Sequence, residues 1–313
     1  MPLASVDHSM DAPSTTLRPS ADARALPHGA TVREALAWAT SLLSHAGVLS
    51  PRLDAEVLLA HILGWKRARL YAIPEFELTD AQSQAFLASI ERRRRHEPVP
   101  YIVEHREFYG LDFVVDRRVL IPRPETELLV ERALETATQL GVKGQRLILA
   151  DIGTGSGIVA ISLAVNLPGV TVYAADARPE SLEVAALNAA RHGVSGRVHL
   201  RHGNLLDPLP ERVHIIVANL PYVPTKLLAF LAPDVVAYEP LAALDGGEDG
   251  LLHIRRLLAQ AGRWLLPNGA ILLEIGAGQG EEVVALSSQH YVAAKVELFQ
   301  DYAGLERIVR IST

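Results

Sequence analysis

The stretch that decides the fold runs from Leu147 to Gly157 and reads LILADIGTGSG. Its first half, Leu147 to Ile152, is an apolar run typical of a buried strand. The glycines that follow allow the backbone to turn sharply and to approach a ligand closely, and a helix is expected to begin at Ile158. A strand, a glycine-rich turn and a helix in this order are typical of α/β proteins that bind a nucleotide cofactor.

Strands and helices alternate downstream of this turn. We predict further strands at residues 170–175, 198–201, 213–218 and 270–275, and helices at 158–166, 179–191, 251–265 and 281–289. Such alternation indicates an α/β fold with a doubly wound, mainly parallel sheet. The last two strands, 295–299 and 307–311, are separated by too short a segment for a parallel crossover. We therefore expect a seven-stranded sheet whose last strand pair is antiparallel.

A second motif follows the strand predicted at residues 213–218 and reads Asn219-Leu220-Pro221-Tyr222. Ligands of open α/β sheets bind beyond the carboxyl ends of the strands. The side-chain oxygen of Asn219 and the carbonyl of Leu220 can each accept an N–H. Pro221 fixes the loop, and Tyr222 can stack on a flat group. The motif predicts a clamp for a planar amine-bearing group, either an amide or a nucleobase. The plain alternative is a polar loop after a core strand.

An acidic residue accompanies the glycine-rich turn. The next predicted strand is followed by Asp176, 19 residues past Gly157, where a carboxylate can bind both hydroxyls of a ribose. A dinucleotide-binding loop reads G-x-G-x-x-G, whereas its last position here is Ile158. The pattern D-x-G-x-G-x-G instead resembles the S-adenosylmethionine loop of class I methyltransferases. A methyltransferase is therefore favoured over a dehydrogenase.

The chain before this region is divided into segments of different character. Residues 1–30 are rich in Ala, Ser, Pro and Asp and lack periodicity, so we predict a disordered tail. Residues 31–100 follow a helical pattern and are predicted to form a small helical domain. Within it, we interpret Arg92 to Arg95 as a solvated helix end; the alternative is that these arginines bind rRNA or a protein. Residues 101–118 contain a β-hairpin linker, and residues 119–313 form the catalytic domain.

Composition excludes several classes of protein. The chain contains no Cys, and its twelve His are scattered without ligand spacing, so we expect no disulfide and no metal site. The net charge of −6 argues against a broad nucleic-acid surface. No apolar stretch approaches the length of a membrane span, and no signal peptide is evident at the start. We expect a cytoplasmic monomer without a membrane or a stable nucleic-acid partner.

Several further segments resemble one family, the release-factor glutamine N5-methyltransferases. The similarity extends from Thr31 to Thr313 and rests on the glycine loop, the Asn219–Tyr222 motif, and the segments EPVPYI (97–102), REFYG (106–110), VLIPRPETE (119–127) and EPLAALDGGEDGL (239–251). The resemblance implies a class I methyltransferase fold. It also implies methylation, by S-adenosylmethionine, of the glutamine in the Gly-Gly-Gln loop of bacterial class I peptide chain release factors 1 and 2, which the helical domain would help to dock.

The resemblance also implies roles for individual residues. The cofactor would be bound by Gly153, Thr154, Gly155, Ser156, Gly157, Asp176, Asn204, Leu205 and Asn219. The substrate amide would be held by Asn219, Leu220, Pro221 and Tyr222, of which Asn219, Pro221 and Tyr222 are the catalytic candidates. Arg123 and Glu125 would lie beside the cofactor pocket.

Two departures from the family pattern keep alternatives open. Leu220 stands where the family usually has Pro, and Asn-Leu-Pro-Tyr resembles rRNA adenine dimethyltransferases. Gly203-Asn204-Leu205 stands where the family often has an Asp and an aromatic residue near the adenine. The alternatives are therefore an adenine-N6 methyltransferase, a glutamine methyltransferase of a ribosomal protein, and a module that binds the cofactor without catalysis. From Val119 onward, 16 Lys and Arg stand against 21 Asp and Glu, which disfavours a nucleic-acid substrate.

Overall fold

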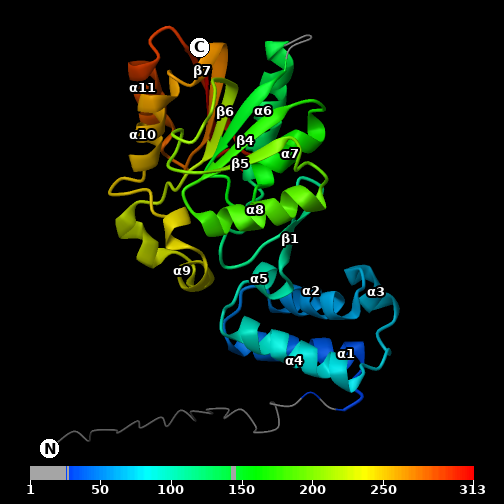
Figure 1. Ribbon diagram of the computed structural model, residues 1–313. Helices are drawn as coiled ribbons and strands as arrows, with labels where there is room; N and C mark the ends of the chain where they lie inside the picture. The colour runs from blue at the N-terminus through cyan, green and yellow to red at the C-terminus, as the bar shows by residue number, and fades with distance from the viewer. Residues whose placement is uncertain (1–25, 27, 142–145) are drawn as a thin grey trace, which may run out of the picture. The chain divides into compact units, whose positions relative to one another are not determined.

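The computed structural model describes residue 26 and residues 28–141 and 146–313. It divides the chain into two compact units, Met1–Arg94 and Arg95–Thr313, which are described separately (Figure 1). Most of the tail predicted at residues 1–30 lies outside the described residues. Ala30 is buried and its carbonyl accepts a hydrogen bond from the Leu78 N–H, so the first folded unit includes the end of that segment.

The first unit consists of helices. These are α1 (Val32–His45), α2 (Pro51–Leu63), α3 (Arg67–Ala72) and α4 (Asp80–Arg94). Thr31 and Glu34 form a capping box at the start of α1, and Gly64 ends α2 in the left-handed conformation. The short helix α3 was not predicted from the sequence.

Apolar side chains from α1, α2 and α4 form the core of the first unit. Leu43, Leu59, Phe86 and Ile90 are completely buried. Arg93 is also buried, and its Nε lies 2.7 Å from Oδ2 of Asp54 in α2. The interpretation of Arg92 to Arg95 as a solvated helix end was therefore wrong for Arg93, which joins α4 to α2 within the unit.

A seven-stranded sheet forms the centre of the second unit. Its strands are β3 (Ile148–Ile152), β4 (Thr171–Asp176), β5 (Val198–His202), β6 (Val213–Asn219), β7 (Leu265–Glu274), β8 (Lys295–Gln300) and β9 (Glu306–Ser312). They lie in the order β5-β4-β3-β6-β7-β9-β8. The strands β3 to β7 pair in parallel, while β9 is antiparallel to both β7 and β8. The predicted sheet is confirmed.

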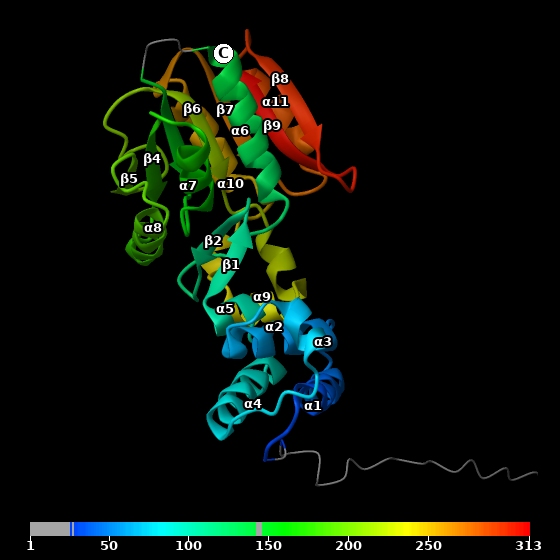
Figure 2. The same ribbon diagram turned by 90° about the vertical axis from the view of Figure 1, so that its right-hand side faces the viewer.

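Helices cover both faces of this sheet, as Figure 2 shows. One core contains side chains of α6 (Thr126–Leu140), α7 (Ile158–Asn166) and α8 (Pro179–Arg191), and the other contains side chains of α10 (Leu252–Ala261) and α11 (Gly280–His290). All residues of β3 are buried, Asp151 included, which fits the central position of this strand in the sheet.

The connection from β6 to β7 differs from the prediction. The helix expected at residues 251–265 ends at Ala261, and Leu265 already pairs with Val213 as the first residue of β7. The apolar pattern alone did not distinguish the end of the helix from the start of a strand, whose identity depends on pairing with β6. Three short helical segments before α10 were also not predicted: η2 (Thr225–Phe230), α9 (Pro233–Tyr238) and η3 (Leu241–Ala243).

The predicted β-hairpin is confirmed and belongs to the second compact unit. It consists of β1 (His105–Phe108) and β2 (Leu111–Val114), and it follows the short helix α5 (Val99–Val103). The Tyr101 hydroxyl in α5 donates a hydrogen bond of 2.6 Å to the Val119 carbonyl. This bond fixes the start of the segment that leads toward α6.

Candidate functional site

A cavity of about 270 Å³ lies at the carboxyl ends of the central strands. It is lined by eight of the residues predicted for the site, namely Gly153, Gly155, Asp176, Asn204, Leu205, Asn219, Leu220 and Pro221. These residues follow β3, β4, β5 and β6, which are neighbours in the sheet. The parallel order of the strands therefore brings together motifs that are far apart in the sequence.

The glycine-rich turn needs its glycines for two different reasons. Gly153 has a φ of 75°, and a Cβ added there would lie 3.1 Å from the Leu220 side chain. Gly157 has a φ of 84°, and a Cβ there would lie 2.8 Å from the Ile161 side chain. The first glycine thus lets the turn pack against the Asn219–Tyr222 motif, and the last lets α7 begin close to its neighbours.

Asp176 connects the end of β4 to this turn. Its Oδ2 accepts a hydrogen bond of 2.9 Å from the Gly155 N–H, and its Oδ1 accepts one of 2.9 Å from the Arg178 N–H. Burial raises the pKa of the carboxyl, while these two bonds act in the opposite direction. A carboxylate has about four acceptor sites. Asp176 therefore keeps acceptor capacity for a ligand in the cavity.

A second carboxyl lies beneath the turn. Asp151 is completely buried, and its Oδ2 accepts hydrogen bonds from the Thr154 hydroxyl at 2.6 Å and the Ala160 N–H at 3.1 Å. Burial raises the pKa of Asp151 to about 6. The hydroxyl of Thr154 thus points to Asp151, and neither Thr154, Ser156 nor Gly157 lines the cavity. Contact of these three residues with a cofactor stays a prediction.

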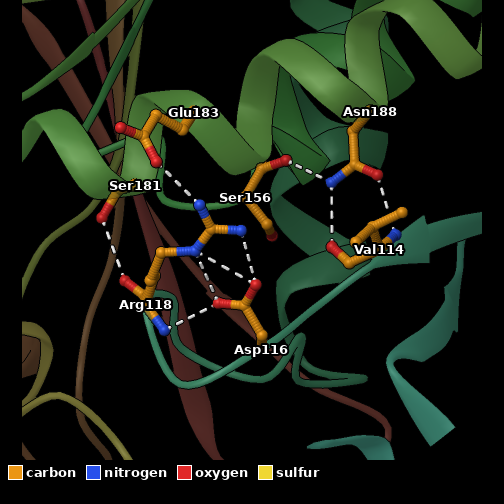
Figure 3. A network of polar contacts seen from close by, with 7 residues as sticks. All are labelled: Val114, Asp116, Arg118, Ser156, Ser181, Glu183 and Asn188. Carbon is orange, nitrogen blue, oxygen red and sulfur yellow. Dashed lines mark hydrogen bonds and ion pairs between the residues drawn. The ribbon is translucent and has the colours of Figure 1, made fainter.

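A buried amide links the hairpin to the turn, as Figure 3 shows. Asn188 of α8 donates from Nδ2 to the carbonyls of Val114 and Ser156, at 3.0 and 2.9 Å. Its Oδ1 accepts a bond of 2.7 Å from the Val114 N–H. Both N–H groups of the Asn188 amide and one lone pair of its oxygen are thus used. These bonds fix the position of β2 relative to the glycine-rich turn.

Arg118 makes a neighbouring set of polar contacts (Figure 3) and also lines the cavity. Its guanidinium donates to both oxygens of Asp116 and to Glu183 of α8, and its carbonyl accepts a bond from the Ser181 hydroxyl. Arg118 and Ser181 both line the cavity, although neither was predicted as a site residue. The signal available in the sequence was their position just before the VLIPRPETE segment and just after Asp176.

Asn219 is the last residue of β6, and its amide group has a defined partner. Its Nδ2 donates a hydrogen bond of 3.1 Å to the Thr126 hydroxyl oxygen at the start of α6. With the nitrogen used in this way, the side-chain Oδ1 of Asn219 is the atom left to accept a hydrogen bond from a ligand. The next residue, Leu220, is buried against the turn, as the contact with Gly153 shows.

Tyr222 lies beyond the cavity rather than in its wall. It is not among the lining residues, and a Cβ added at Gly276 would lie 3.2 Å from its ring. The Tyr222 carbonyl accepts a hydrogen bond of 3.1 Å from Gln279 Nε2. Burial raises the pKa of the Tyr222 hydroxyl. Stacking of Tyr222 on a substrate stays a prediction.

The segment around Asp245–Gly250 packs against the loop that follows Asn219. The Gly246 N–H donates to the Val223 carbonyl at 2.8 Å, and the Val223 N–H donates to the Leu244 carbonyl at 3.0 Å. Gly250 has a φ of 83°, and a Cβ there would overlap the Tyr222 carbonyl oxygen. The EPLAALDGGEDGL segment therefore shapes the loop that follows Asn219.

The VLIPRPETE segment is held by a buried carboxylate. Glu239 accepts hydrogen bonds from the Arg123 guanidinium at 2.6 Å and from the Ile121 N–H at 3.2 Å. Arg123 lines a smaller pocket that adjoins Gly153 and Asn219, in agreement with the position expected for it. Glu125 does not line either pocket, and its role stays a prediction.

Comparisons with known proteins show which family this chain is similar to. The family described as "PrmC N-terminal domain" matches residues 34–103, and that described as "Ribosomal protein L11 methyltransferase (PrmA)" matches residues 124–241. The chain is 43% identical over 278 residues to the release factor glutamine methyltransferase of Moorella thermoacetica, covering 88% of this chain and 96% of that protein. It is 38% identical over 281 residues to the protein of the same name from Agrobacterium fabrum, covering 90% and 96%.

A solved structure with the same fold is the hMettl16 catalytic domain in complex with MAT2A 3'UTR hairpin 6. It has a TM-score of 0.51 at 14% identity and covers 74% of this chain and 82% of that chain, a likeness that shows the fold alone. The sheet order and the glycine-rich turn after β3 place the protein in the class of class I methyltransferases. Within this class, the chain belongs to the release factor glutamine methyltransferase family. The fold class and the family predicted from the sequence are both confirmed.

Two further expectations can be compared with the described part of the chain. No group of His, Asp and Glu there could hold a metal ion. Nor does any helix among the described residues have the length and apolar character needed to cross a membrane.

Proposed function

We propose that this protein transfers a methyl group from S-adenosylmethionine to the side-chain nitrogen of the glutamine in the Gly-Gly-Gln loop of bacterial release factors 1 and 2. The observation that carries this proposal is the orientation of Asn219. Its amide nitrogen is used by Thr126, so that its Oδ1 can accept a hydrogen bond at the cavity. An acceptor in this place fits an N–H of a carboxamide.

The residues around the cavity fit the cofactor. Asp176 has acceptor capacity for ribose hydroxyls, and Gly155 leaves the backbone of the turn open to a ligand because nothing lies within 4 Å of the place that a Cβ would take. Asn204 and Leu205 follow β5 in the same wall, where an amide can bond to an adenine edge and an apolar side chain can pack on its face. When bound, S-adenosylmethionine supplies a methyl group on a positively charged sulfur, which is left as a neutral thioether.

The chain itself contributes orientation and fixed dipoles. An amide nitrogen is a weak nucleophile because its lone pair is shared with the carbonyl group. Asn219 Oδ1 and the Leu220 carbonyl would accept its two N–H groups and favour the positive charge that develops as the N–C bond forms. The nitrogen then loses one proton to water, which restores a neutral amide. Pro221 supports this geometry by fixing the backbone between these acceptors and Tyr222.

The first unit has a separate part in the proposal. We infer that the helical segment, residues 31–100, helps to dock the release factor and that residues 101–118 link it to the catalytic domain at 119–313. We further infer a cytoplasmic monomer that binds no membrane or nucleic acid. The excess of acidic residues after Val119 supports a protein substrate over a nucleic acid.

Mass spectrometry of purified release factor tests the proposed function directly. The full chain is incubated with S-adenosylmethionine and release factor 1 or 2, and the Gly-Gly-Gln peptide is examined for the gain of one methyl group. Asn219→Ala is expected to lower the rate by about 100-fold or more, because it removes an acceptor made for the transition state. Asn166→Ala is the matched control, because Asn166 is exposed on α7 and bonds only to the Ser162 carbonyl there.

Parallel acceptors separate the competing functions. Ribosomal RNA and ribosomal proteins are offered under the same conditions. Methylated adenine without methylated release factor would overturn the proposal in favour of a nucleic-acid enzyme, and a methylated ribosomal-protein glutamine would point to that substrate instead. Binding of S-adenosylmethionine without any transfer would indicate a binding module.

A further inference from the structure

Glu274 is a buried acid beside the proposed catalytic amide. It is the last residue of β7 and lies directly opposite Asn219, the last residue of β6, in the parallel register. Only 1% of its surface is exposed. Neither of its carboxyl oxygens has a hydrogen-bond partner of normal geometry among the described residues. Burying a carboxyl group without a partner costs free energy. Among the described residues no ion pair with Glu274 offsets this cost, and its neighbour Arg307 pairs with Asp301 instead.

Thr126 is a polar neighbour of both Glu274 and Asn219, and it lines the smaller pocket beside the cavity. Its hydroxyl oxygen accepts the hydrogen bond from Asn219 Nδ2, so the hydroxyl proton is free to point elsewhere. Thr126 and Asn219 are also polar neighbours that act to lower the pKa of Glu274, so both lie near its carboxyl group, although neither has normal hydrogen-bond geometry to it. The three side chains are thus neighbours, and Asn219 is the one that lines the cavity.

We propose that Glu274 is a positioning residue, which through Thr126 holds the Asn219 side chain with Oδ1 toward the cavity. This inference rests on the proposed function, in which Oδ1 accepts an N–H of the substrate. An ionised carboxylate can only accept hydrogen bonds. An ionised Glu274 therefore favours the arrangement in which the Thr126 hydroxyl hydrogen and the Asn219 NH2 face it, whereas a flipped Asn219 would place its oxygen beside the negative charge. The same charge makes Oδ1 a stronger acceptor.

The charge of Glu274 depends on pH in a useful range. Burial raises its pKa to about 7, against the effects of Thr126, Asn219 and of Arg307 in β9, while Glu125 before α6 raises it further. Tyr222 also faces this acid, which raises the pKa of the tyrosine hydroxyl. Below about pH 7 the protonated acid gains a donor and no longer selects one orientation of the amide. Methyl transfer should therefore fall on the acid side of neutrality with the uptake of one proton.

Glu274→Gln in the full chain tests this role, because it keeps the size of the side chain but adds a donor. The expected result is a fall in kcat of about 10- to 100-fold. The dissociation constant of S-adenosylmethionine, measured by calorimetry, should stay unchanged, and the acid limb of the pH profile near 7 should disappear. Thr126→Val removes the hydroxyl and should lower kcat as Glu274→Gln does. Thr126→Ser keeps a hydroxyl and should retain the wild-type rate. The control is Glu281→Gln, an exposed acid on α11.

A second measurement does not depend on activity. In the NMR spectrum of the wild-type protein, the side-chain NH2 signals of Asn219 should shift with an apparent pKa near 7, and Glu274→Gln should remove this shift. An unchanged kcat and pH profile in Glu274→Gln, or Asn219 signals without a transition in the wild type, would overturn the inference. If the wild-type protein methylates no release factor, the proposed function is overturned instead. The NMR titration of the wild type still tests the role of Glu274 in that case, and also if the Glu274→Gln variant does not fold.

Discussion

Oε1 of Glu239 lies 2.6 Å from Nη2 of Arg123, although 116 residues separate them in the sequence. The Glu239 side chain is 1% exposed, whereas that of Arg123 is 31% exposed. The same carboxylate accepts the Ile121 N–H. One buried acid thus joins the segment after α9 to the segment before α6, and both segments border the proposed substrate site.

Replacing this acid should unfold the site. Glu239→Ala leaves the Arg123 charge and the Ile121 N–H without their partner, so we expect a loss of about 3 kcal/mol in the free energy of unfolding. The measurement is urea denaturation of the full chain. Glu135→Ala is the control, because Glu135 pairs with Arg132 in an exposed i,i+3 arrangement on α6 that contributes about 0.5 kcal/mol or less. Equal losses in the two variants would show that the Glu239 contacts have no special importance.

Alanine substitutions at Gly250 and Gly278 distinguish the effect of steric overlap from that of backbone strain. Both have positive φ, 83° and 84°, but only a Cβ at Gly250 meets other atoms, namely the Tyr222 carbonyl oxygen and Gln279 Nε2 at 2.7 Å. Gly278→Ala should cost about 1 kcal/mol from its conformation alone. Gly250→Ala should cost more and should also lower kcat strongly, because it displaces the loop after Asn219. Thermal unfolding and methyl-transfer assays of the two variants make the comparison. Equal activities would contradict this role of Gly250.

Most of the fold could be predicted from the sequence because each strand of the sheet has a recognisable apolar pattern in its own residues. The glycines after β3, the acid that ends β4 and the Asn-Leu-Pro-Tyr motif that begins with the last residue of β6 stand at strand ends, so the parallel topology determined that they would meet. The length of β7 was missed because its first residue, Leu265, is defined by pairing with Val213 and not by its neighbours in sequence.

Other parts of the site could not be predicted because their roles depend on distant contacts. Glu274 was an acid within an apolar strand, and nothing local indicated that it would lie opposite Asn219. Likewise, the partner of Glu239 could not be found from spacing. Tyr222 shows the reverse case, since its position after a strand suggested the cavity wall, whereas its ring packs at Gly276.

Asp151 gives a test by pH. Burial raises its pKa from 3.8 to about 6, so the folded state binds this proton more tightly than the unfolded chain does. The ionised carboxylate therefore lowers stability above about pH 6, and this cost disappears as the pH falls toward 4. The difference corresponds to about 3 kcal/mol in the free energy of unfolding. Asp151→Asn removes the titration, while its side-chain oxygen can still accept the bonds from Thr154 and Ala160.

Urea denaturation of wild type and Asp151→Asn between about pH 4 and about pH 7 measures this effect. The stability of the variant relative to wild type should increase by up to about 3 kcal/mol as the pH rises through this range. Asp207→Asn, at an exposed position, should follow the wild type throughout. A difference between Asp151→Asn and wild type that does not change with pH would contradict the raised pKa.

Asp176 should act on the cofactor and not on the substrate. Asp176→Asn keeps one acceptor for the Gly155 or Arg178 N–H but loses the charge that would strengthen bonds to two ribose hydroxyls. A charge-assisted hydrogen bond contributes about 1.5–3 kcal/mol, so the dissociation constant of S-adenosylmethionine should rise by about 10- to 100-fold. Calorimetry with the full chain measures it, with Asp207→Asn as the control. At saturating cofactor the KM for release factor should stay near the wild-type value, because the Asn219 acceptors are untouched. Unchanged cofactor affinity in Asp176→Asn would place the ribose elsewhere.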